Sequence, residues 1–166
     1  MAERASDRGL AAPAVLGAVM PDVPIAVGVG WLFLRRGGGF GRGEFESEVC
    51  ARTVFRGPDA ALHSVLPIGT ALALRTITGK AGDMDRALLA FLLGWAGHVV
   101  TDALTHTEDA RPTFWPFSGW RFRGPVSYWD RRHHARAFSM LEHASLLLAV
   151  GEVLRQGAGK RQRRRR

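Results

Sequence analysis

The chain has 166 residues, enough for one domain with a real core, and 46% of its residues are hydrophobic. Its single cysteine, Cys50, excludes an intrachain disulfide and any zinc site built on cysteines, so a metal would need histidine and carboxylate ligands. The formal net charge of +8 comes mainly from the stretch 111–136 and the tail 160–166. Such a tail suits acidic lipid or nucleic acid, or it is simply a solvated end.

The first apolar stretch, 10–34, is long enough to cross a membrane as a helix, which takes about 20 apolar residues. Pro21 and Pro24 flank Asp22 in its middle and disrupt the helix there. Two interpretations of Asp22 follow. It caps a second helix that begins at Val23, or it faces a functional cavity, because a carboxylate inside an apolar span is costly.

A flexible, glycine-rich connector, 35–57, leads to the second apolar stretch, 60–74. Asp59 is expected to cap the helix that follows. Pro67 cannot donate a hydrogen bond to the carbonyl of His63, so a kink is predicted where His63 projects. A lone histidine in such a helix is typical of a structural residue. A ligand role for His63 therefore requires partners from other segments.

The third apolar stretch, 87–104, leads into the most informative pattern of the chain. His98, Asp102 and His106 are spaced four residues apart, so they lie along one stripe of a helix, on which Gly94 leaves room. Imidazole and carboxylate together suit zinc or a similar divalent metal. The alternative is a core histidine, an aspartate near a helix end and a surface histidine.

A long loop, 107–128, separates this helix from a fourth apolar stretch, 138–154, which contains Glu142. Aromatic side chains in the loop argue against disorder, and aromatics mixed with arginine suit the interface between lipid and water. These aromatics are Phe114, Trp115, Phe117, Trp120 and Phe122. We predict one helical domain, 1–155, followed by a basic, disordered tail, 156–166.

The whole chain is predicted to be all-α, since no segment shows the two-residue alternation of a strand. We expect a bundle of about four apolar helices, embedded in a membrane, with the long loop rich in aromatic residues and arginine. A soluble all-α bundle is the alternative. The stretches 60–74 and 138–154 are short for a membrane crossing and carry polar residues.

Four short motifs connect these segments to a known family. On them, the part of the chain from 12 to 148 resembles the membrane-bound, predicted metal-dependent hydrolases of bacterial inner membranes, which are distantly similar to zinc-dependent phospholipase C. The motifs are Pro21-Asp22, His63-Ser64, the helix from Gly94 through His98 to Asp102, and Trp115-Pro116-Phe117.

The resemblance implies a helical membrane protein with a hydrolase-type metal site. The matching ligand positions are Asp22, His63, His98 and Asp102, with His106 as a weaker match. Family members commonly carry a histidine ahead of the Pro-Asp pair, whereas no histidine precedes His63 here. The site then has one ligand fewer, or the start of the chain is truncated.

We therefore expect a membrane-associated, metal-dependent hydrolase that acts on an ester or phosphoester of a lipid-like or other small molecule. Zinc is the favoured metal, and it would lower the pKa of bound water and polarise a substrate oxygen. Glu142 and Asp102 are the candidate catalytic carboxylates, with Glu142 as the base. The expected location is the bacterial inner (cytoplasmic) membrane, with lipid as a partner and no nucleic acid.

Two other functions fit the same sequence. One is a non-catalytic helical membrane protein whose buried polar residues pair with one another and fix the packing of the helices. The other is a protein that binds acidic lipid or nucleic acid through its basic tail.

Overall fold

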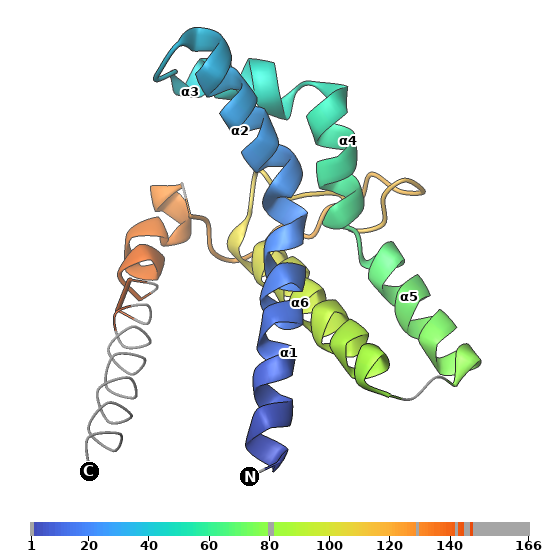
Figure 1. Cartoon of the computed structure of the whole chain (residues 1–166). Coiled ribbons are helices and arrows are strands. Elements are labelled where there is room, and N and C mark those ends of the chain that lie inside the picture. Colours follow the sequence, from blue (N-terminus) through green and yellow to red (C-terminus); the bar gives the residue numbers. More distant parts are fainter. Residues whose placement is uncertain (1, 80–81, 129, 142, 145–146, 148–166) are drawn as a thin grey trace, which may run out of the picture.

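The computed structural model describes residues 2–79, 82–128, 130–141, 143, 144 and 147 (Figure 1). Within these residues the fold is helical and has no strand, which confirms the all-α prediction. The predicted count of four apolar helices is not confirmed, because most of the stretch 138–154 lies outside the described residues. The elements are α1 (Ala2–Val19), η1 (Met20–Asp22), α2 (Val23–Arg36), α3 (Arg42–Phe45), η2 (Glu46–Cys50), α4 (Thr53–Leu62), α5 (Val65–Thr78), α6 (Asp83–Thr105) and η3 (Arg131–His133).

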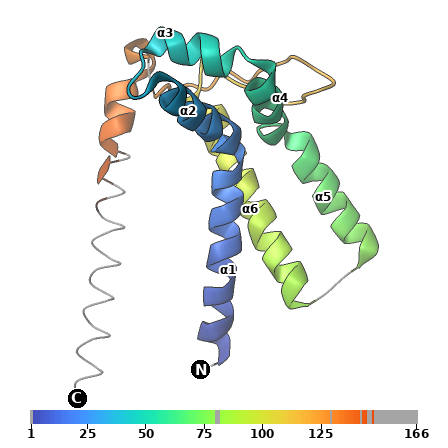
Figure 2. The same ribbon diagram turned by 45° about the horizontal axis from the view of Figure 1, so that its top comes forward.

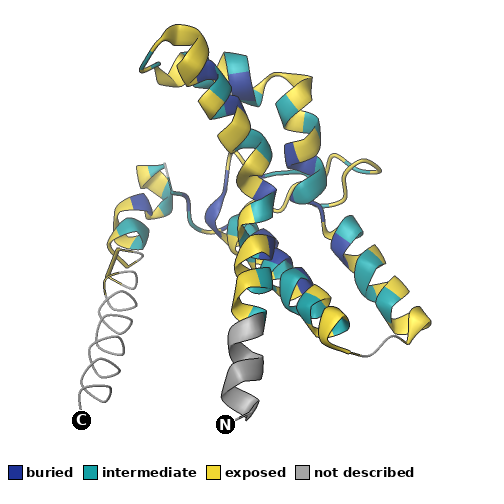
Figure 3. Ribbon diagram, in the orientation of Figure 1, coloured by how far each residue is buried: buried dark blue, intermediate teal, exposed yellow. Residues whose placement is uncertain are grey.

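Two segments of the described chain are long and apolar enough to cross a membrane, Leu10–Arg36 and Asp83–Thr105. Helices α4 and α5 form a third if a pair bent by 46° counts as one span. Large apolar side chains are exposed along these segments, and exposed residues occur on every helix (Figure 3). A lipid surround would remove this apolar surface from water, so the fold favours membrane association.

Helix α1 packs along α6 at a crossing that only small residues permit. A Cβ atom added at Gly17 would collide with the backbone carbonyl of Phe91, and one added at Gly94 with that of Ala14. Small residues let two helix backbones approach this closely, as they do in membrane-protein helix pairs. Gly94 thus leaves space on this stripe of α6, as expected, but the backbone of α1 occupies that space.

A small core joins α5 to α6 and holds the corner between α4 and α5. Ile68 of α5 packs against Leu92, Trp95 and Val99 of α6, and all four are buried. The indole Nε1 of Trp95 donates a hydrogen bond of 2.6 Å to the carbonyl of Leu62, the last residue of α4. This bond satisfies a carbonyl that the helix end leaves free.

The helices break at two places that lie at the same level of the molecule. The chain turns through η1 between α1 and α2, and it turns again between α4 and α5. Helices α1, α5 and α6 extend to one side of this level, whereas α2, α3 and α4 lie on the other (Figures 1 and 2). Both breaks therefore bring polar residues next to the continuous helix α6.

The second break differs from the predicted kink. Helix α4 continues through Asp59 to Leu62, so Asp59 is not its cap, and Ser64 caps α5 by accepting a hydrogen bond from the amide of Leu66. Pro67 falls in the first turn of α5, where a missing N–H leaves no helical hydrogen bond unmade. The proline thus begins a new helix instead of bending an existing one.

The hydroxyl of Ser64 also anchors the long loop to this break. It lies 3.1 Å from the carbonyl oxygen of Thr113 and 3.0 Å from that of Trp115. The amide of Val65 donates to Thr113 as well, over 3.0 Å. The loop is therefore held against the helix break from which His63 projects.

Candidate metal centre

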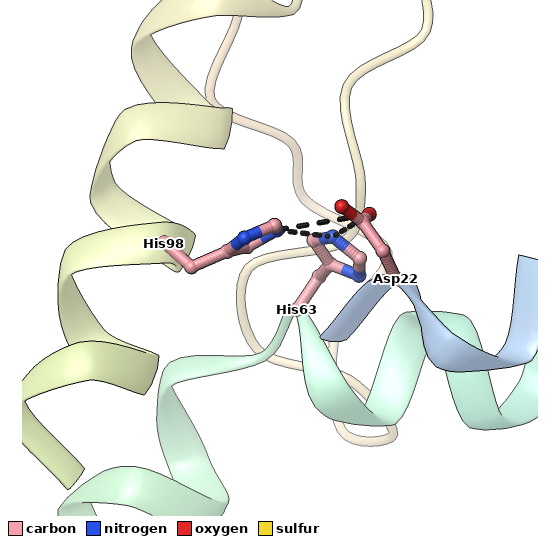
Figure 4. Close-up of side chains that lie close together, drawn as sticks. All are labelled: Asp22, His63 and His98. Atoms are coloured by element: carbon pink, nitrogen blue, oxygen red, sulfur yellow. Dashed lines mark hydrogen bonds and ion pairs between the residues drawn. The ribbon is translucent and has the colours of Figure 1, made fainter. Parts of the chain in front are cut away.

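Three side chains from three elements converge at the level of the breaks (Figure 4). Asp22 comes from η1, His63 from the break between α4 and α5, and His98 from the middle of α6. The two Nε2 atoms are 3.3 Å apart, and each lies 3.8 Å from Oδ1 of Asp22. Two nitrogen ligands of one tetrahedral zinc, bound at about 2.0–2.1 Å, lie about 3.3 Å apart. The predicted convergence of these three residues is confirmed.

Asp102 lies one helical turn beyond His98 and borders this three-residue group. Its Oδ1 is 3.9 Å from Nε2 of His63. The shared stripe of His98 and Asp102 is thus confirmed, because α6 continues past both. The three converging residues present two imidazoles and one carboxylate, with the carboxylate of Asp102 beside them, and this donor set suits zinc. Two imidazole nitrogens at this distance need a shared proton or a cation between them.

His106 does not join the cluster, although its spacing predicted that it would. Helix α6 ends at Thr105, and His106 has extended backbone dihedral angles of −120° and 127°, so it leaves the stripe. Its Nδ1 lies 3.0 Å from Oδ1 of Asp102, and its Nε2 lies 3.7 Å from Asp109. Burial lowers the pKa of His106, but the hydrogen bond to Asp102 and the charge of that carboxylate outweigh it and raise the pKa. His106 is therefore a partner of Asp102.

The ring of His63 is oriented by the backbone and side chain of Asp59. Nδ1 of His63 lies 2.8 Å from the carbonyl oxygen of Asp59 and 3.4 Å from its Oδ1. With the proton on Nδ1, the ring donates to Asp59 and turns the lone pair of Nε2 toward the cluster. Metal-binding histidines in proteins are commonly held in this way. Among the described residues, Oδ1 of Asp59 is a buried oxygen with no hydrogen-bond partner.

Arg111, from the long loop, links Asp59 to Asp102. Its Nε lies 3.4 Å from Oδ2 of Asp59, and its Nη1 lies 3.7 Å from Oδ1 of Asp102. Burial lowers the pKa of Arg111, but the charges of Asp102 and Asp59 raise it by more, so the guanidinium stays charged. One half-buried cation thus offsets part of the negative charge that surrounds the cluster.

Sequence reasoning missed the roles of Asp59 and Arg111. The four-residue spacing from Asp59 to His63 is the same signal that singled out His98 and Asp102, but Asp59 was interpreted as a helix cap. No local pattern connects Arg111 to Asp59, which lies 52 residues earlier. Glu142, the predicted base, lies outside the described residues.

The cluster opens onto a cavity of about 1390 Å³. Asp22, His98 and Asp102 line this cavity together with apolar side chains from α2, α3 and the long loop. His63 forms the back of the cluster, since only 1% of its side chain is exposed, against 60% for Asp22. A metal bound here would therefore contact the buried His63 on its protein side, and a substrate would reach the metal from the cavity.

Comparison with known proteins gives no match. No protein-family model matches the chain, and no curated protein or solved structure matches it.

Proposed function

We propose that this protein is a membrane-associated, zinc-dependent hydrolase that acts on an ester or phosphoester of a lipid-like molecule. The convergence of Asp22, His63 and His98 beside a large cavity carries the proposal. Catalytic zinc sites commonly have three protein ligands and one open position, whereas structural sites have four protein ligands. A three-residue ligand set that faces a cavity fits the catalytic pattern.

The residues around the three ligands fit the chemistry of hydrolysis. Zinc supplies a bound water of lowered pKa and polarises the substrate oxygen. Asp102 is the candidate base that takes a proton from the attacking water, because its carboxylate borders both the cluster and the cavity. His106 contacts the same carboxylate and orients it. In this assignment Asp102 replaces Glu142 as the main catalytic carboxylate.

The order of the motifs supports membership of the bacterial inner-membrane hydrolases that the sequence resembles. Asp22, His63 and His98 come from its three polar motifs and form one group, and Asp102, from the same motif as His98, borders it. Trp115, from the fourth motif, lines the same cavity. Motifs whose residues form one site are expected to occur together in the proteins that have this site. We accordingly propose the bacterial inner membrane as the location of the protein.

The test is to measure bound metal and hydrolysis in His98→Ala and Asp102→Ala. We expect His98→Ala to lose zinc and Asp102→Ala to bind it at least about tenfold more weakly, with helix content nearly unchanged, because alanine favours helix. Zinc stoichiometry, circular dichroism and turnover of a chromogenic phosphodiester and carboxylic ester check this. His133→Ala is the control, since His133 contacts Asp130 outside the cluster.

A wild-type protein that stays metal-free after dialysis against zinc and manganese would refute the proposal. The polar residues would then serve only to fix helix packing, and both alanine variants would lose stability instead.

A further inference from the structure

Both positive and negative side chains border the cavity beside the metal cluster, and its carboxylates are Asp22, Glu46, Asp59, Asp102 and Asp109. Four arginines line it: Arg42, Arg56, Arg111 and Arg121. Arg42 pairs with Glu46 over 2.7 Å, and Arg111 lies between Asp59 and Asp102. Among the described residues, no carboxylate lies within 4.0 Å of Arg56 or Arg121. Two guanidinium groups are thus left to bind something else.

Arg56 belongs to the face of α4 that borders the cavity. Thr53, Arg56, Gly57 and Ala60 all line it, at the spacing of one helix face. His63 follows Arg56 by seven residues, which is two helical turns or about 10 Å along the axis. Arg56 and the candidate metal ligand His63 therefore lie on the same side of α4, about two helical turns apart.

Arg121 reaches the cavity from the other side, on the long loop. The loop doubles back on itself, so that Arg121 pairs with Pro112 in an antiparallel bridge. The amide of Thr113 donates to the carbonyl of Trp120 over 3.0 Å and holds this pairing. The bridge brings Arg121 next to the chain at Arg111, which contacts the cluster directly.

The rest of the cavity wall is largely apolar and includes the aromatic side chains of Phe40, Phe45 and Trp115. The cavity also lies near one end of a candidate membrane span. His98 precedes the end of α6 by seven residues, so the cluster lies about 10 Å from that end. A ligand in this position can place a charged group against the arginines and an apolar part against the aromatic wall.

We propose that the cavity binds an amphiphile with an anionic phosphoryl group, held by Arg56 and Arg121 beside the metal cluster. This inference rests on the proposed hydrolase function and specifies its substrate class. Guanidinium groups bind phosphate through paired, charge-assisted hydrogen bonds. Arg56 and Arg121 come from separate elements and line the same cavity as Asp22 and His98, and a phosphoryl group has more oxygens to offer them than a carboxylate has.

The test uses the full chain, loaded with zinc, in micelles of dodecyl maltoside, a detergent that carries no phosphoryl group. Isothermal titration calorimetry compares dihexanoyl phosphatidate, dihexanoylglycerol and inorganic phosphate, and zinc stoichiometry is measured on every sample. We expect phosphatidate to bind at least about tenfold more tightly than dihexanoylglycerol, which has the same chains without the phosphate. The double variant Arg56→Gln/Arg121→Gln is expected to lose at least about tenfold in phosphatidate affinity.

Arg123→Gln is the matched control, because Arg123 is an exposed arginine of the same loop that does not line the cavity. It should bind phosphatidate like the wild type, and Arg121→Lys should retain part of the affinity. Inorganic phosphate that binds as tightly as phosphatidate supports the phosphoryl site and assigns it to a water-soluble source. Tighter binding of phosphatidate assigns it to a lipid.

Equal binding of dihexanoylglycerol, or equal losses in the double variant and in Arg123→Gln, would overturn the inference. Zinc bound without any preference for the phosphoryl group overturns this inference alone. Absence of zinc from the wild type refutes the proposed hydrolase, while the arginine variants still decide whether the phosphoryl group is recognised.

Discussion

At the scale of single residues, the candidate centre depends on a chain of partners behind the ligands. The Nε2 atom of His63 faces the cluster, and its Nδ1 atom faces Asp59. Arg111 lies between Asp59 and Asp102 and contacts both. The buried, unpartnered Oδ1 of Asp59 is costly unless it serves the ring of His63. We therefore regard Asp59 as a residue that positions His63.

Replacing Asp59 with asparagine tests this role. We expect Asp59→Asn to weaken zinc binding about 10–100-fold, because the amide of asparagine removes the charge that favours a proton on Nδ1. Competition with a metal-binding dye measures the zinc affinity, and circular dichroism reports the fold.

Asp85→Asn is a matched control for Asp59→Asn. The side chains of Asp85 and Asp59 are both 11% exposed, and Asp85 pairs with Arg75 over 2.7 Å, away from the cluster. This control should lower stability and leave zinc affinity unchanged. Equal zinc affinities in the two variants would show that Asp59 has only a packing role.

At the scale of helices, the close crossing of α1 and α6 holds Asp22 against His98. Asp22 ends the short element η1 that follows α1, and His98 lies one turn beyond Gly94. The distance between α1 and α6 therefore sets the distance between these two candidate ligands. Even a methyl group at the crossing would move them apart.

Gly94→Ala is the corresponding test. The new Cβ would meet the backbone of Ala14, which cannot move aside as a flexible side chain can. We expect a loss of roughly 1–3 kcal/mol in the free energy of unfolding, as for overpacked cores, together with weaker zinc binding. Thermal unfolding in detergent, with and without zinc, measures both effects.

Gly97→Ala makes the same chemical change on the same helix. No atom lies within 4 Å of its new Cβ, so this variant should be neutral or more stable by up to about 1 kcal/mol. Similar losses of stability in both variants would show that the crossing is not the cause.

At the scale of the whole molecule, apolar side chains are exposed along the two candidate membrane spans. In the candidate spans Leu10–Arg36 and Asp83–Thr105, only 11% and 17% of the most apolar stretch is buried inside the molecule. Most of each apolar stretch is therefore left to be covered by lipid or by another protein.

We expect the full chain to fractionate with membranes and to need detergent for extraction. Lipid around the apolar windows of the two candidate spans is the physical reason. Sedimentation of membranes, a wash in high salt and extraction in detergent, each followed by immunoblotting, measure the distribution. Quantitative recovery of a stable monomer in the salt-washed soluble fraction would contradict the prediction. The salt wash also separates binding through the basic tail, which is salt-dependent, from insertion.

Composition and spacing were enough to predict the helical class and the break at Asp22. Hydrophobic periodicity reports helices directly, and the four-residue spacing of His98 and Asp102 singled them out as candidate ligands. For Asp22 and His63 the residues alone allowed a structural role as well, and the resemblance to a hydrolase family added them as ligand positions. The two candidate membrane spans follow from the same stretches. These features depend on neighbours in the chain, which the sequence contains.

Only the tertiary structure decided which polar groups meet. His106 left its predicted stripe because α6 ends one residue before it, and helix ends depend on the packing that surrounds them. Asp59 and Arg111 became partners because the long loop folds back onto the break after α4. Contacts between residues so far apart in the chain come from packing, which local spacing does not encode.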